Sequence, residues 1–165
     1  MKRLGAILTA ILLSVSLCVC ATSCQKQEEG EADGTFTVTY RDVKLTVGED
    51  AEPVLKALGE PSNKKEIGDC GGLGAQVRYD YSSLILYVLE SKEGDVIDQI
   101  TLTDDLVSTQ KGIGIGDSQD KVKEAYGNVL QSDGSRLVYT SGNKTLTFQI
   151  ENGTVSGIDL MQVTQ

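Results

Sequence analysis

The sequence predicts an α+β fold in which two short helices pack on one face of an antiparallel sheet. Two observations support this class: a helix motif that occurs twice in the chain, and period-two apolar runs with turn signals after each copy. Neither copy has enough apolar residues for a core of its own. The sequence therefore predicts two related helix-plus-antiparallel-meander halves that share one core.

The helix motifs lie at residues 48–59 and 116–127 and correspond position by position at a constant offset. Asp50 and Ser118 are residue types whose side chains accept hydrogen bonds from the first free N–H groups of a helix. Gly59 and Gly127 are typical of the position at which a helix ends. Because apolar residues between these signals recur at helical spacing, we expect two short helices.

The strand signals also come in two sets. The Asn-Gly dipeptide at 152–153, between two apolar runs, is a strong hairpin signal. Ile97 and Ile100 are three residues apart, which breaks the alternation and predicts a β-bulge, and Val155 and Ile158 repeat this irregularity at the equivalent place in the second half. The expected strands are 76–81, 84–89 and 96–103 in the first half and 135–139, 144–150 and 154–160 in the second, after an N-terminal hairpin over 36–47.

The N-terminal residues carry the signals of export. Two basic residues precede an uncharged apolar run over residues 5–19, and small residues follow, which is the pattern of a secretory signal peptide. The stretch Ala21–Cys24, with sequence ATSC, resembles the lipobox of bacterial lipoproteins, although Ala stands where Leu is commonest. The resemblance implies that residues 1–23 are removed and that the thiol of Cys24 receives a diacylglyceryl group. An uncleaved membrane anchor and plain secretion are the alternatives.

Residues 24–34 are predicted to form a flexible tether, because the stretch after Cys24 has no large apolar residue to bury. Residues 35–165 form the expected folded domain, with repeats over 36–105 and 111–162. Removal of residues 1–23 takes away two positive charges and no acids, which changes the formal net charge from −9 to −11. Because anionic headgroups repel an acidic body, we expect acyl chains to attach the protein to the membrane.

Composition excludes several classes of activity. The chain has 15 Lys and Arg residues against 24 Asp and Glu residues, whereas nucleic-acid binding needs a basic face for the phosphates. The chain has no His, which removes Ser-His-Asp and Cys-His catalytic arrangements and all His-bearing zinc sites. We therefore expect no nucleic-acid partner. Composition leaves Ser-Lys chemistry open, but we also expect no cofactor, no metal site and no enzymatic activity.

The same unit occurs in both halves: an extended segment, a polar N-cap, a short helix and a β-meander, with the helix ending in Leu58-Gly59 or Tyr126-Gly127. This unit resembles two groups of proteins. One is the tandem-repeat β-lactamase-inhibitor-protein-like (BLIP-like) fold, and the other is the small outer-membrane lipoproteins of the SmpA/OmlA type. The unit is also similar to small tethered lipoproteins of Gram-positive anaerobes. The resemblance covers residues 36–160 and implies a protein-interaction module outside the cytoplasmic membrane. It does not imply inhibition of a β-lactamase, because no inhibitor contact residue maps onto this chain.

Three tyrosines are the candidate partner-binding residues. Tyr79 and Tyr81 share one strand face by period two, and Tyr87 is expected on the neighbouring strand. A sheet face that carries Tyr offers a partner large contact area at low entropic cost. The alternative is that these tyrosines cover the core.

A glycine-rich segment and two groups of acidic residues are expected to have structural roles and not to bind ligands. The segment Gly112–Gly116 precedes a helix, but its glycine spacing matches neither a dinucleotide-binding motif nor a P-loop, so we expect it only to lead into the capped helix. Asp104-Asp105 and the acids Asp117 and Asp120 lack the spacing of a Ca²⁺-binding loop. We expect them to be solvated turn and cap residues.

Cys70 is the one cysteine that remains in the mature chain if Cys24 is lipidated. It lies in a glycine-rich loop, and no His is present to activate its thiol. An inert or partly buried thiol is the expected state, and an intermolecular disulfide or a redox-modified site is the alternative.

These observations favour a lipid-anchored, extracytoplasmic interaction module at the cell membrane that binds another envelope protein. The alternative is a lipoprotein that binds a small solute or a cation through its acidic loops, and an envelope hydrolase is the third hypothesis. An apolar pocket with converging polar groups would favour the solute. An open sheet face that carries Tyr, without a pocket, would favour the protein partner.

Overall fold

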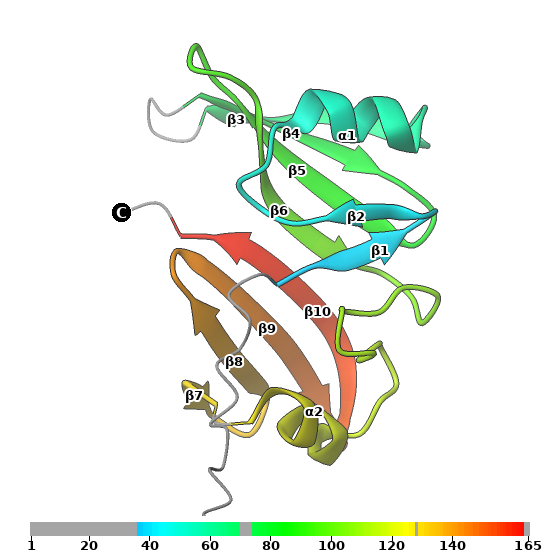
Figure 1. Ribbon diagram of the computed structural model, residues 1–165, viewed down its shortest axis with the longest axis vertical. Helices are drawn as coiled ribbons and strands as arrows, with labels where there is room; N and C mark the ends of the chain where they lie inside the picture. Colours follow the sequence, from blue (N-terminus) through cyan, green and yellow to red (C-terminus); the bar gives the residue numbers. More distant parts are fainter. Residues whose placement is uncertain (1–35, 70–73, 128, 164–165) are drawn as a thin grey trace, which may run out of the picture.

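The computed structural model describes residues 36–69, 74–127 and 129–163 (Figure 1). The predicted signal peptide, Cys24, the tether and Cys70 lie outside these residues. Within them the chain forms two sheets and two helices. The strands are β1 (Val38–Tyr40), β2 (Val43–Leu45), β3 (Asn63–Asp69), β4 (Ala75–Asp80), β5 (Leu84–Glu90), β6 (Val96–Leu102), β7 (Gln131–Ser132), β8 (Arg136–Ser141), β9 (Lys144–Glu151) and β10 (Thr154–Gln162), and the helices are α1 (Ala51–Leu58) and α2 (Gln119–Tyr126).

The fold is mainly β, so the predicted α+β class is wrong. Strands hold 51% of the described residues and helices 13%. Each helix has eight residues, little more than two turns, and two such helices cannot form a layer that covers the whole eight-stranded sheet. The sheet is also larger than predicted, because β3 and β7 extend it at its two edges.

Strand β3 shows why the sequence understated the sheet. Its residues, NKKEIGD, are exposed at every position except Gly68, so the strand has no buried face for a period-two pattern to mark. β3 forms because it pairs with β4, for example Asn63 with Asp80. As an outer strand it carries Lys64 and Lys65, and such charges protect a sheet edge from unwanted pairing.

The helices begin and end where the sequence predicts. The side chain of Asp50 accepts a hydrogen bond from the N–H of Glu52 at 3.0 Å and so caps α1. Ser118 caps α2 in the same way, through a 3.2 Å bond from the N–H of Lys121. At the other ends, the N–H groups of Gly59 and Gly127 donate to carbonyls of the last helical turn.

The main sheet has the strand order β3-β4-β5-β6-β10-β9-β8-β7, which joins two four-stranded meanders through β6 and β10. Across this junction Ile100 pairs with Leu160, and Leu102 pairs with Ile158. Ile158 and Leu160 are the second-half counterparts of Ile100 and Leu102, so each half presents equivalent positions to the other. The junction is therefore self-complementary, as at a two-fold interface.

The halves repeat the same backbone hydrogen bonds around their helices. In the first half the N–H of Gly48 donates to the carbonyl of Ile97 at 2.7 Å, and in the second half Gly116 donates to Val155 at 2.8 Å. Two further backbone bonds recur between equivalent positions of the halves. The N–H of Ile97 donates to Glu49 as that of Val155 does to Asp117. The N–H of Ala51 donates to Asp95 as that of Gln119 does to Gly153.

The predicted β-bulges are present. Asp98 is the extra, unpaired residue on β6 where β6 faces β5, and Ser156 is its counterpart on β10 where β10 faces β9. The two positions are equivalent in the repeat. Each bulge increases the local twist of its strand next to the hydrogen bonds that hold the loop before the helix.

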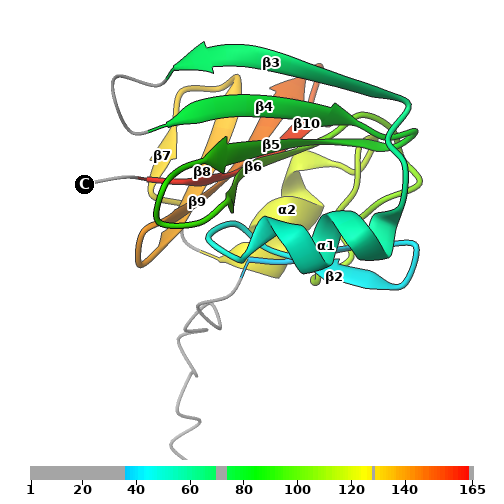
Figure 2. The same ribbon diagram turned by 90° about the horizontal axis from the view of Figure 1, so that it is seen from above.

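The buried apolar side chains form one cluster to which both halves contribute. The cluster lies between the inner face of the main sheet and the elements that cover this face, namely α1, α2 and the β1–β2 hairpin (Figure 2). Beneath α2, the centroids of neighbouring aromatic rings are 5.2–6.3 Å apart, and burial raises the pKa of Tyr126 to about 12. The rings of this aromatic cluster are those of Phe36, Tyr126, Tyr139 and Phe148.

Candidate interaction surface

The two faces of the main sheet differ in what covers them. Both helices and the β1–β2 hairpin lie on one side (Figure 2), and no described element lies over the other side. The burial pattern agrees, because side chains alternate between buried and partly exposed along β4, β5, β6 and β9. We call the uncovered side the open face. It carries Gln76, Arg78, Asp80, Ile85, Tyr87, Gln99, Thr101, Thr147, Gln149, Asp159 and Met161.

The register places a row of large side chains across four neighbouring strands of the open face. Arg78 on β4 stands opposite Tyr87 on β5, Tyr87 opposite Gln99 on β6, and Gln99 opposite Met161 on β10. Met161 is 42% exposed. Arg, Tyr and Met are enriched at protein–protein interfaces. The open face therefore has the composition of a contact surface.

Charged groups on the open face near the junction of the halves are already satisfied within the chain. The carboxylate of Asp159 accepts hydrogen bonds from Thr101 at 2.7 Å, from Gln149 at 3.0 Å and from Gln99 at 3.3 Å. Because each oxygen of this carboxylate has a donor, covering it with a partner costs less than covering an isolated charge.

Charged groups towards the β3 edge of the open face also have partners within the chain. Arg78 and Asp80 form an ion pair, and Asn63 donates a further hydrogen bond to Asp80 at 2.9 Å. The hydrogen bond from Arg78 is the main reason why the pKa of Asp80 lies below its ordinary value. Nearby, the side-chain amide of Gln76 donates to Asp98 at 2.8 Å.

The three tyrosines do not form one surface, which corrects the predicted site. Tyr79 and Tyr81 are 7% and 6% exposed and belong to the core on the helix side of the sheet. Tyr87 lies on the opposite face, partly exposed and paired with Arg78. The period-two rule placed Tyr79 and Tyr81 together correctly. It could not relate them to Tyr87, because the register between β4 and β5 decides that relation.

Tyr79 and Tyr81 instead line a shallow groove between the end of α1 and β3. The groove has a volume of about 810 Å³, and its other walls come from residues 55–56 and 59–64. The Nζ of Lys64 lies 4.8 Å from the centre of the Tyr79 ring, and the hydroxyl of Tyr81 donates to the carbonyl of Gly59 at 3.3 Å. Tyr79 and Tyr81 are themselves buried, so their rings expose little surface to a small solute in the groove.

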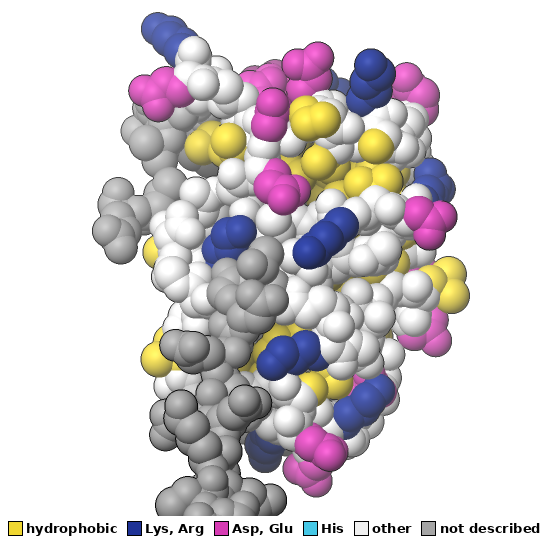
Figure 3. Space-filling model, in the orientation of Figure 1, with side chains coloured by type: hydrophobic (Ala, Val, Ile, Leu, Met, Phe, Trp, Pro, Cys, Tyr) yellow, Lys and Arg dark blue, Asp and Glu magenta, His cyan; other side chains and the backbone are white. Residues whose placement is uncertain are grey.

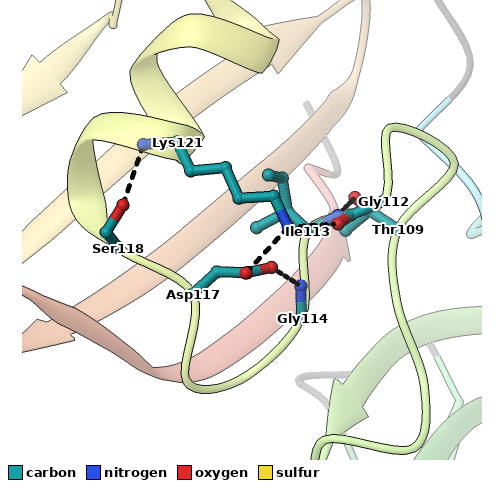
Figure 4. Close-up of polar contacts among 7 residues, drawn as sticks. All are labelled: Thr109, Gly112, Ile113, Gly114, Asp117, Ser118 and Lys121. Carbon is teal, nitrogen blue, oxygen red and sulfur yellow. Dashed lines mark hydrogen bonds and ion pairs between the residues drawn. The ribbon is translucent and has the colours of Figure 1, made fainter.

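The Gly112–Gly116 segment forms a closed hydrogen-bonded loop before α2 (Figure 4). The carboxylate of Asp117 accepts from the N–H of Gly114 at 2.8 Å and from the Nζ of Lys121 at 2.8 Å. Lys121 also donates to the carbonyl of Gly112 at 3.2 Å. An N–H group that a phosphate loop would present to its ligand is thus occupied by Asp117, which agrees with the structural interpretation.

Replacing Asp117 with asparagine is expected to lower the free energy of unfolding at neutral pH by about 1 kcal/mol. The hydrogen bond from Lys121 holds the pKa of Asp117 below its ordinary value, and the N–H of Gly114 adds to the effect. A carboxyl with a lowered folded-state pKa stabilises the fold above its unfolded pKa, and this contribution is lost as the pH falls through the folded pKa. Urea unfolding as a function of pH measures the difference, which should vanish at strongly acidic pH. A difference that stays constant with pH would contradict the assigned role.

The acidic residues do not converge on a cation site in the part of the chain that the structure describes. No group of three or more His, Cys, Asp or Glu side chains comes together there. Asp104 accepts a hydrogen bond from the N–H of Leu106 at 3.0 Å, as a turn residue does. Asp117 and Asp120 pair with lysines of α2 at 2.8 and 3.9 Å.

Sequence reasoning missed most residues of the open face. Gln99 and Asp159 lie on opposite sides of the junction between the halves, far apart in the chain, and meet through their hydrogen bond. A signal was present in the polar residues that alternate with Ile97, Ile100 and Leu102 on β6. That signal indicates that β6 has an uncovered side, but it does not identify which strands continue that side.

No protein-family model and no curated protein matches the chain. Among solved structures, a DUF4309 family protein, YjgB from Bacillus subtilis, is similar at 16% identity with a TM-score of 0.39, over 70% of this chain and 79% of that one. This likeness assigns neither fold nor function. The resemblance to BLIP-like and SmpA/OmlA-type proteins stays a prediction. No helix in the described ranges is long and apolar enough to cross a bilayer.

Proposed function

We propose that this protein is a non-catalytic interaction module of the cell envelope, anchored by a lipid on Cys24, and that it binds another envelope protein through the open face. The observation that supports the proposal is an uncovered sheet face on which the carboxylates of Asp80 and Asp159 already accept hydrogen bonds within the chain. The proposal combines this surface with the export and lipid-attachment signals at the N-terminus.

The physical reason concerns the cost of desolvation. A partner that covers the open face removes water from side chains that keep their hydrogen bonds, so the contact area around Tyr87 and Met161 contributes net affinity. With residues 1–23 removed, the chain carries a formal charge of −11. The open face therefore selects its partner by shape and apolar contact, while the remaining surface repels other acidic proteins.

A small-solute or cation receptor has less support. The groove near Tyr79 and Tyr81 is open, and its aromatic floor is covered. Within residues 36–69, 74–127 and 129–163, no cluster of metal-ligating side chains supplements it.

Photo-crosslinking in intact cells tests the proposal. A photoreactive residue in place of Tyr87 is expected to form a specific adduct, and the same residue in place of the exposed Lys56 on α1 is the control from the opposite side of the sheet. Met161→Arg should weaken adduct formation from position 87 about tenfold or more, because it places a charge in the contact area. Equal adducts from positions 87 and 56, or adducts indifferent to Met161→Arg, would contradict a partner on the open face. In the same cells Cys24→Ser should release the protein from the membrane fraction, which tests the anchor separately.

A further inference from the structure

Three lysines lie around the β1–β2 hairpin. They are Lys44, Lys111 and Lys144, and we call them the basic patch. None of the ion pairs between described residues includes any of them. Figure 3 shows Lys and Arg side chains along the middle of the face that carries the hairpin and the helices, whereas acidic side chains gather mainly at the end that carries α1. In a chain with an acidic excess, this local grouping of cations calls for an explanation.

A hydrogen bond places Lys144 beside the end of β2, and Lys44 lies on β2 itself. The Nζ of Lys144 donates to the hydroxyl of Thr46 at 3.1 Å, and this hydroxyl donates to the carbonyl of Phe36 at 2.7 Å. Lys44 is exposed on β2, two residues before Thr46 in the chain. Lys44 and the Thr46 that binds Lys144 are thus close together in the chain.

The third lysine, Lys111, follows a residue that is hydrogen-bonded to Thr37, just before β1. The N–H of Gln110 donates to the carbonyl of Thr37 at 2.9 Å, and the N–H of Thr37 donates to the side chain of Gln110 at 2.8 Å. Lys111 follows Gln110 directly. Its Nζ lies 4.9 Å from the centre of the Tyr126 ring and donates to the carbonyl of Ala125 at 2.9 Å, so its exposed charge is held at the C-terminal end of α2, where the Tyr126 ring neighbours that of Phe36.

The basic patch therefore surrounds the point where the chain enters the described fold, at Phe36 and Thr37. The short stretch of chain from Cys24 to Phe36 spans at most about 40 Å when fully extended. If Cys24 carries the anchor, the patch is the part of the domain closest along the chain to the bilayer. This step rests on the anchor of the proposed function and does not depend on the open face.

We propose that the basic patch binds the anionic headgroups of the membrane to which Cys24 is anchored. The acidic excess does not prevent this contact, because salt screens charges beyond about 8 Å at physiological ionic strength. Close to the patch, Asp42 is the acid of the hairpin turn. On the α2 side, Asp117 and Asp120 form ion pairs with Lys121 and Lys123 at 2.8 and 3.9 Å, and Glu124 is an exposed acid next to Ala125.

This contact would orient the whole domain. The hairpin and both helices lie on one side of the main sheet and the open face on the other (Figure 2). With the basic patch against the bilayer, the open face turns away from the membrane and towards a partner protein. The overall acidic charge would then keep the remaining surface off the anionic bilayer.

Vesicle binding by a chain of residues 25–165, which lacks the anchor, tests the patch alone. All described strand pairs and core residues lie within residues 36–163, so this chain keeps every described contact. It is expected to co-sediment with phosphatidylglycerol-containing vesicles and not with phosphatidylcholine vesicles. Lys44→Gln, Lys111→Gln and Lys144→Gln should each reduce binding about fivefold, and the triple variant about 100-fold. The control triple variant Lys64→Gln/Lys65→Gln/Lys92→Gln changes the net charge equally and should bind like the parent chain.

Equal losses in the two triple variants, or equal binding to the two kinds of vesicle, would overturn the proposal. So would binding that appears only after Glu28, Glu29, Glu31 and Asp33 are neutralised, because the chain's own acidic segment would then occupy the patch. Hydrogen exchange on the full-length anchored protein provides a second measurement. Residues 38–45 should exchange more slowly in phosphatidylglycerol-containing vesicles than in phosphatidylcholine vesicles, and unchanged exchange would count against the contact. Membrane fractionation of the Cys24→Ser variant tests the lipid anchor separately, so a failure of the anchor can be distinguished from a failure of the patch.

Discussion

Replacing Phe148 with alanine is expected to lower the free energy of unfolding by about 4 kcal/mol, which is a large part of the stability of a domain of this size. The Phe148 side chain is completely buried on β9. Its ring centre lies 5.2 Å from that of Tyr126 and 5.9 Å from that of Tyr139. The substitution therefore removes apolar burial and leaves a cavity beneath α2, in the middle of the aromatic cluster. Urea unfolding followed by far-UV circular dichroism measures the loss.

The matched control is Phe148→Leu, which keeps most of the apolar volume and should cost about 1.5 kcal/mol or less. Alkaline titration of the phenols adds a second readout. In the parent protein Tyr126 should ionise with a pKa of about 12, because burial disfavours its charged form. In Phe148→Ala the pKa should fall towards the ordinary value of 10 as water enters. A stable Phe148→Ala protein with an unchanged Tyr126 titration would show that the aromatic cluster is not packed as described.

Replacing Gly74 with alanine is expected to destabilise the protein by about 4 kcal/mol, through the sum of backbone strain and steric overlap. Gly74 has a φ of +134°, and a Cβ built there would lie 2.2 Å from the carbonyl oxygen of Glu90. That carbonyl belongs to the end of β5, which pairs with the beginning of β4. The substitution should therefore separate the two strands at this end of the sheet.

The Gly94→Ala variant separates the cost of backbone strain from the cost of steric overlap. Gly94 has nearly the same φ, +130°, but a Cβ there would meet nothing within 4 Å. Its cost should therefore be backbone strain alone, about 1–3 kcal/mol. The difference between the two variants in chemical denaturation measures the overlap with Glu90. If both variants lose the same stability, the close approach of Gly74 to β5 is refuted.

Local features of the fold were predictable because short segments specify them. The side chains of Asp50 and Ser118 cap their helices through bonds to residues two and three positions away. The bulges at Asp98 and Ser156 follow from a one-residue break in an apolar alternation. By contrast β3 carries no apolar face, so nothing in its residues indicates that it extends the sheet and shifts the class from α+β to mainly β.

The candidate surfaces were less predictable for a related reason. Tyr87 was selected from the sequence, but Gln99, Asp159 and Met161 were not. Their common surface exists only because β6 pairs with β10, a strand from the other half of the chain. The basic patch is similar, since its three lysines are distant in the sequence and reach one side of the sheet through contacts of residues 36–46. A net charge calculated from composition cannot show such a local excess of cations.

The sequence by itself determined the acidic charge, the absence of His, the helix caps and the bulge positions, because each of these depends on composition or on residues close together in the chain. The tertiary structure alone decided which side of the sheet stays uncovered, which tyrosines enter the core and which lysines share a surface. These outcomes depend on strand register, and a shift of one residue moves every side chain of a strand to the opposite face. Register is set by pairing between segments far apart in the chain, so it is a property of the assembled sheet.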